Sequence, residues 1–118
     1  MALTSVILVA DDEPDAIFLL RRALDKAGIV NPVRIVKNGT QAIQYLEGTG
    51  AFADRVEYPL PWLLLLDIKM PQANGFEVLD WVRSQPGLYG LRVVMLTASD
   101  QMKDLSRAYQ RGADSFLI

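Results

Sequence analysis

Five short runs of apolar residues are spaced along the chain and separated by polar segments. They predict strands at Val6–Ala10, Val33–Val36, Trp62–Leu66, Arg92–Leu96 and Ser115–Ile118. The first, third and fourth runs are apolar nearly throughout instead of alternating. Such runs are typical of strands that have helices over both faces.

Between these runs, apolar residues recur every three or four positions, which predicts four amphipathic helices. Asn74 and Glu77 have the spacing of a capping box at the start of the third helix. The four helices are marked in order by Ile17, Leu20, Leu24 and Ala27; by Ala42, Ile43 and Leu46; by Val78, Leu79 and Val82; and by Met102, Leu105 and Tyr109. The order βαβαβαβαβ predicts one α/β domain with a parallel sheet and right-handed crossovers.

The composition excludes several classes of protein. Apolar residues make up 51% of the chain, which rules out a disordered protein, and the formal net charge of -2 argues against nucleic acid as the main partner. The chain has no Cys and no His, so disulfides, thiolate or imidazole metal ligands and Ser-His or Cys-His catalysis are excluded. The sequence shows neither a signal-like start nor an apolar stretch of about 18 residues, so we expect a cytoplasmic protein without membrane contact.

Polar side chains follow three of the predicted strands directly: Asp11 and Asp12 the first, Asp67 the third and Thr97 the fourth. The carboxyl ends of parallel strands meet at one edge of a sheet, where ligands bind. Two carboxylates about 5 Å apart repel by about 3 kcal/mol at an effective dielectric near 20, so three of them require a cation. Oxygen ligands suit Mg²⁺. Asp67 could then act as a nucleophile toward phosphorus, and Thr97 could donate a hydrogen bond to a phosphoryl oxygen.

Each residue also has a simpler interpretation. Asp11 and Asp12 precede Glu13-Pro14, where they could cap a helix, and Asp67 alone could be a turn residue. Thr97 could be another helix cap, Lys69 a solvated cation and Phe116 a core residue. The functional reading depends on their joint placement at one edge of the sheet.

Four segments resemble the receiver domain of bacterial two-component response regulators, and together they cover essentially the whole chain. They are "VILVADDEPD", "LLLLDIKMPQANGFEVL", "VVMLTASD" and "GADSFLI". The long segment between the second helix and the third strand is similar to that of single-domain regulators paired with bacteriophytochrome-type kinases.

The resemblance implies a flavodoxin-like (CheY-like) doubly wound sheet of five parallel strands in the order 2-1-3-4-5. It also implies that Asp67 is the phosphoacceptor. Asp12 and Asp67 would bind Mg²⁺ (or Mn²⁺) directly, the main-chain carbonyl of Lys69 would be a further ligand, and Asp11 would act largely through a metal-bound water. Met70-Pro71 would turn the chain so that this carbonyl faces the ion.

The same resemblance implies a signalling switch and its partners. Thr97 would be the switch hydroxyl and Phe116 the switch aromatic, which together change the surface around the fourth helix and fifth strand. The phosphoryl donor would be a sensor histidine kinase or a phosphotransfer protein. The domain would catalyse only its own phosphorylation and dephosphorylation, so it would not otherwise be an enzyme.

The chain departs from the family at its carboxyl end. The family places a lysine after the fifth strand and then a last helix, and the sequence stops at Ile118, before both. We therefore expect residues 1–118 to be a receiver domain truncated after strand 5, with an uncovered apolar face through which it could form a homodimer.

Two other functions are open. The missing lysine is compatible with an inactive receiver-like module that only binds other proteins. An Asp-nucleophile phosphohydrolase commonly carries a second acid two residues after the nucleophile, whereas this position is Lys69.

Overall fold

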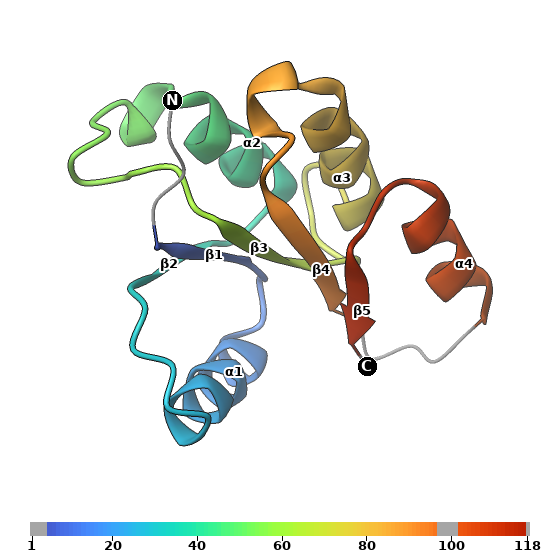
Figure 1. Ribbon diagram of the computed structural model, residues 1–118, viewed down its shortest axis with the longest axis horizontal. Coiled ribbons are helices and arrows are strands. Elements are labelled where there is room, and N and C mark those ends of the chain that lie inside the picture. Colours follow the sequence, from blue (N-terminus) through green and yellow to red (C-terminus); the bar gives the residue numbers. More distant parts are fainter. Residues whose placement is uncertain (1–4, 97–101, 118) are drawn as a thin grey trace.

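Five parallel strands form one sheet at the centre of the computed structural model, which describes residues 5–96 and 102–117 (Figure 1). The strand order is β2-β1-β3-β4-β5, and every neighbouring pair is parallel. The strands are β1 (Ile7–Ala10), β2 (Val33–Val36), β3 (Leu63–Asp67), β4 (Arg92–Leu96) and β5 (Ser115–Leu117). The predicted α/β class and the order 2-1-3-4-5 are confirmed.

The strand boundaries differ from the predicted ones in few places. The predicted bounds of β2 and β4 are correct. Strand β3 starts one residue later than predicted and includes Asp67, because Asp67 still pairs with Leu96 of β4. The last residue of the fifth predicted run, Ile118, lies outside the described residues.

Four α-helices connect the strands, namely α1 (Pro14–Lys26), α2 (Gly39–Glu47), α3 (Gly75–Ser84) and α4 (Met102–Gln110). Two 3-10 helices that the apolar pattern did not predict, η1 (Gly50–Phe52) and η2 (Pro86–Leu88), lie in the connections. The predicted capping box is present at the start of α3, where Asn74 and Glu77 each accept a backbone hydrogen bond from the other residue. Among the described residues, every helix is too short or too polar to span a lipid bilayer.

The two faces of the sheet are covered unequally. Helices α2, α3 and α4 contribute to a large buried cluster on one face, together with Leu64 and Met95 of the central strands. The other face carries a cluster with only three buried residues, Ile7, Val9 and Leu65. Among the described helices, only α1 lies on this side, and none of its residues is buried (Figure 1). The apolar runs predict helices over both faces of the sheet. In the described part of the chain, helices bury only one of the two faces well.

The long connection between α2 and β3 is folded against the end of α2. The guanidinium of Arg55 donates hydrogen bonds to the carbonyls of Tyr45 (2.7 Å), Leu46 (2.8 Å) and Tyr58 (3.1 Å). The rings of Tyr45, Phe52 and Tyr58 contact one another, with centroids 5.2 to 5.9 Å apart. Arg55 thus binds carbonyls at the carboxyl end of α2, where the last carbonyls of a helix lack the N–H donors of a following turn; the Tyr45 carbonyl also accepts from the Gly48 N–H at 3.2 Å.

Candidate metal centre

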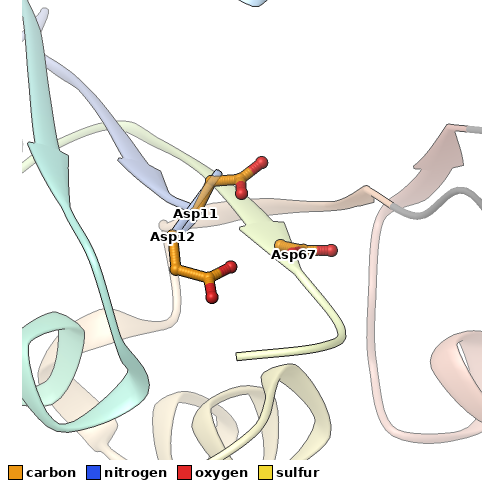
Figure 2. Close-up of side chains that lie close together, drawn as sticks. All are labelled: Asp11, Asp12 and Asp67. Carbon is orange, nitrogen blue, oxygen red and sulfur yellow. The ribbon is translucent and has the colours of Figure 1, made fainter. Parts of the chain in front are cut away.

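The register of the sheet brings the first and third strands to the same level. Ala10 of β1 pairs with Leu66 of β3, so Asp11 and Asp67 are the next residues on two adjacent strands. Strand β2, which follows β1 in the chain, lies on one side of β1, and β3 lies on its other side. The strand order therefore reverses at β1 and β3, which is where ligands bind in such sheets. Figure 2 shows that the side chains of Asp11, Asp12 and Asp67 lie beside one another at these strand ends.

The three carboxylates form a compact group. One oxygen from each of Asp11, Asp12 and Asp67 lies within 4.8 Å of the others. Asp11 is buried, with 6% of its surface exposed, whereas Asp67 is half-buried and Asp12 is exposed. The acids that the sequence analysis placed at one sheet edge are therefore together in the structure, and their role as metal ligands stays a prediction.

The helix-capping interpretation of the aspartate pair is not supported. The N-cap residue of α1 is Glu13, and no side chain provides a cap hydrogen bond there. The carboxylate of Asp11 instead accepts a hydrogen bond from the backbone N–H of Glu13 at 3.0 Å, which fixes its orientation within the turn. This turn does not explain why the Asp11 side chain is buried beside two other carboxylates.

The surroundings of Asp67 disfavour its charge. Burial raises the pKa of this carboxyl from 3.8 to about 6, and the negative charges of Asp11 and Asp12 act in the same direction. Hydrogen bonding from the backbone of Lys69 and Ile68 opposes the rise. A cation among these carboxylates would offset the repulsion between them.

The chemistry of the donors fits a hard divalent cation. All three side chains offer carboxylate oxygens, which are the ligands that Mg²⁺ and Mn²⁺ take in proteins.

A glycine lets the start of α3 lie directly against the end of β3. The N–H of Gly75 donates to the carbonyl of Ile68 at 2.8 Å, and a Cβ at position 75 would lie 2.3 Å from the carbonyl oxygen of Asp67. Any larger residue would displace the end of β3 that carries Asp67. The sequence predicts Asn74 as part of the capping box of this helix, but the close approach at Gly75 depends on tertiary structure and has no signal in the sequence.

The remaining predicted site residues are placed as follows. Lys69 has an exposed side chain, and Phe116 of β5 is buried in the large cluster with 9% of its surface exposed. Thr97 follows β4 directly and lies outside the described residues. The functional roles of all three stay predictions.

Comparison with known proteins identifies the family. Residues 7–118 match the family described as the response regulator receiver domain. The chain belongs to the response regulator receiver domain family. This receiver domain is 33% identical to the probable methanogenesis regulatory protein FilR2 of Methanothrix harundinacea over 116 residues, which are 96% of the chain and 70% of FilR2.

Solved structures of response regulators share the fold. The response regulator RPA3017, in red light signaling of R. palustris, has a TM-score of 0.90 and 31% identity, with 98% of the receiver domain and 80% of the RPA3017 chain covered. The Mn²⁺-bound form of the response regulator Rcp1, a protein known from Synechocystis, has a TM-score of 0.86 and 29% identity, with 97% and 80% covered. The chain is thus a signalling domain of two-component systems.

Proposed function

We propose that this receiver domain accepts a phosphoryl group on Asp67 from the phospho-histidine of a sensor histidine kinase or phosphotransfer protein. The observation that carries the proposal is the convergence of Asp11, Asp12 and Asp67 at the switch point of the sheet. Mg²⁺ (or Mn²⁺) is the proposed cofactor, because three carboxylates with oxygens this close need a cation between them.

In the proposed transfer, a carboxylate oxygen of Asp67 attacks the phosphorus atom. An O–P bond forms, the P–N bond of the donor breaks, and its electron pair stays on the imidazole nitrogen. Asp67 must be ionised to attack, and with a pKa of about 6 it is mostly ionised at neutral pH. Asp12 and Asp67 would bind the cation directly, Asp11 through a water, and the carbonyl of Lys69 would complete the protein ligands. When bound there, the cation would neutralise negative charge on the carboxylates and the phosphoryl oxygens.

We further propose how the signal leaves the site. Thr97 would donate a hydrogen bond to the phosphoryl group, and Phe116, which already lies inside the core, would follow this movement and change the surface of α4 and β5. The similarity to RPA3017, which acts in red light signaling, and to the solved bacteriophytochrome response regulators RtBRR and AtBRR supports a kinase of the bacteriophytochrome type as donor. The cytoplasm is the proposed location. The proposed homodimer would form through the thinly covered α1 face, which the unequal clusters support.

Intact-mass measurement with acetyl phosphate and Mg²⁺ tests this function. We expect the unsubstituted protein to gain one phosphoryl group with Mg²⁺ and none in EDTA. The variant Asp67→Asn should gain none under either condition. The matched control is Asp25→Asn, which removes an exposed acid on α1 and should leave the gain unchanged. No gain in the unsubstituted protein would contradict the proposal and favour a module that only binds other proteins. Sustained release of phosphate from small phosphoesters would instead favour a phosphohydrolase.

A further inference from the structure

The turn between β2 and α2, residues 36–40, is hydrogen-bonded both to the backbone of Asp11 and to the loop that follows Asp67. On one side, the N–H of Asp11 donates to the carbonyl of Val36 at 3.1 Å. On the other side, the N–H and the hydroxyl of Thr40 donate to the carbonyl of Gln72 at 2.9 and 3.1 Å, and the N–H of Gly39 donates to the carbonyl of Pro71 at 3.4 Å. We call residues 36–40 the β2–α2 turn. It joins the strand end that carries Asp11 to the loop that follows Asp67.

The loop that receives these hydrogen bonds has a backbone conformation that needs support. Gln72 and Ala73 have φ values of 52° and 76°, in the left-handed region that side chains other than glycine rarely adopt. Two such residues in succession persist when the surrounding structure holds them. The donors on Gly39 and Thr40 bind carbonyls at and next to these positions, so they support the loop where it is least stable by itself.

Position 39 has room for glycine alone. A Cβ there would lie 2.0 Å from the carbonyl oxygen of Ala73 and 2.8 Å from the Ala73 Cβ. The start of α2 is itself fixed, because Asn38 accepts from the Gln41 N–H at 2.8 Å and Gln41 accepts from the Lys37 N–H at 2.9 Å. A side chain at position 39 would therefore displace the loop rather than the helix.

We propose that the β2–α2 turn is a positioning element of the cation site. Gly39 and Thr40 hold the loop at 71–73, and with it the preceding carbonyl of Lys69, at the separation from Asp11 that the cation requires. Neither residue belongs to the proposed ligands, so their effect would be exerted through the loop. The inference rests on the proposed function, since it assigns a role toward the cation that Asp67 and its neighbours would bind.

Two substitutions in the whole chain test this role, each with a matched control. Gly39→Ala inserts the clashing Cβ, and Gly87→Ala is its control because a Cβ at Gly87 meets no atom within 4 Å. Thr40→Val removes the hydroxyl at constant size, and Thr40→Ser keeps the hydroxyl. The first readout is the backbone amide NMR shift of Lys69, Gln72 and Ala73 in EDTA. The second readout is the affinity for Mg²⁺ and Mn²⁺ by titration calorimetry.

We expect Gly39→Ala to shift the three loop amides and to weaken cation binding about tenfold or more, in the range found for residues that orient metal ligands. Thr40→Val should weaken binding about fivefold, the effect of one hydrogen bond. Both controls should bind within about twofold of the unsubstituted protein.

A purely structural role would give a different result. In that case the variants would unfold at lower urea concentration, yet the folded proteins would bind Mg²⁺ as tightly as before and the Lys69 amide would not shift, which would overturn the inference. If Gly39→Ala does not fold, Thr40→Val and Thr40→Ser decide alone. An unsubstituted protein that binds no cation would refute the proposed function together with this inference. A protein that binds Mg²⁺ and is phosphorylated while the variants bind equally well would refute this inference alone.

Discussion

Replacing Asp67 by Asn should stabilise the metal-free protein at neutral pH, although it removes the proposed phosphoacceptor. The folded protein raises the pKa of Asp67 from 3.8 to about 6, chiefly by burial and by the charge of Asp11. At about 1.4 kcal/mol per pKa unit, ionising Asp67 costs the fold at most about 3 kcal/mol. Because the carboxyl is half-buried and solvent screens part of the effect, we expect a gain of about 1–2 kcal/mol in Asp67→Asn.

The pH dependence follows from the direction of the pKa shift. Between pH 3.8 and about 6 the folded state binds more protons at Asp67 than the unfolded state does. The free energy of unfolding therefore falls as pH rises through this window, and above it the loss is constant. The advantage of Asp67→Asn should accordingly be small near pH 4 and complete by about pH 7.

Urea denaturation in EDTA from pH 4 to pH 8 measures this difference. The control Asp25→Asn also removes one negative charge, but from an exposed site on α1, and should change stability by no more than about 0.5 kcal/mol at any pH. With added Mg²⁺ the unsubstituted protein should become more stable than Asp67→Asn, because Mg²⁺ binding stabilises its folded state by mass action. A variant that is no more stable than the unsubstituted protein at pH 7.5 in EDTA would refute the electrostatic reasoning.

Substitutions at three further positions test the fold by urea denaturation. Leu64→Ala in β3, where the side chain has 0% exposure, should cost about 3–5 kcal/mol, and a loss below 1 kcal/mol would show that the central strand is not packed as described. Asn74→Ala should cost about 1 kcal/mol through the lost capping box of α3 and Asn74→Ser much less, so equal losses would exclude capping as the cause. Arg83→Met should cost about 1–3 kcal/mol, since Arg83 donates to the carbonyls of Leu91 and Gly112 and pairs with Asp114; an unchanged urea midpoint would mean that these bonds contribute nothing.

The sequence predicts the sheet well because its information is local. Strands β2 and β4 have the predicted bounds, and the capping box of α3 is visible as two residues three positions apart. The acidic group is also predictable, since the ends of β1 and β3 must meet at the same edge once the sheet is parallel.

The remaining features depend on contacts between distant residues. Gly39 matters because Ala73 lies against it, and no pattern along the chain connects two residues that far apart. The same holds for Arg55, whose three carbonyl partners include the end of α2. Helix α1 has the predicted apolar spacing, yet Ile17, Leu20 and Leu24 on its apolar side are only partly buried, because periodicity shows which side of a helix is apolar and not how much of it is covered.

The most direct test of the central claim is to locate the phosphoryl group. After incubation with acetyl phosphate and Mg²⁺, borohydride reduces an aspartyl phosphate to homoserine, which peptide mass spectrometry can assign to a position. The account predicts homoserine at position 67 alone, and none when Mg²⁺ is replaced by EDTA. Homoserine at position 11 or 12, or equal labelling without a divalent cation, would contradict it.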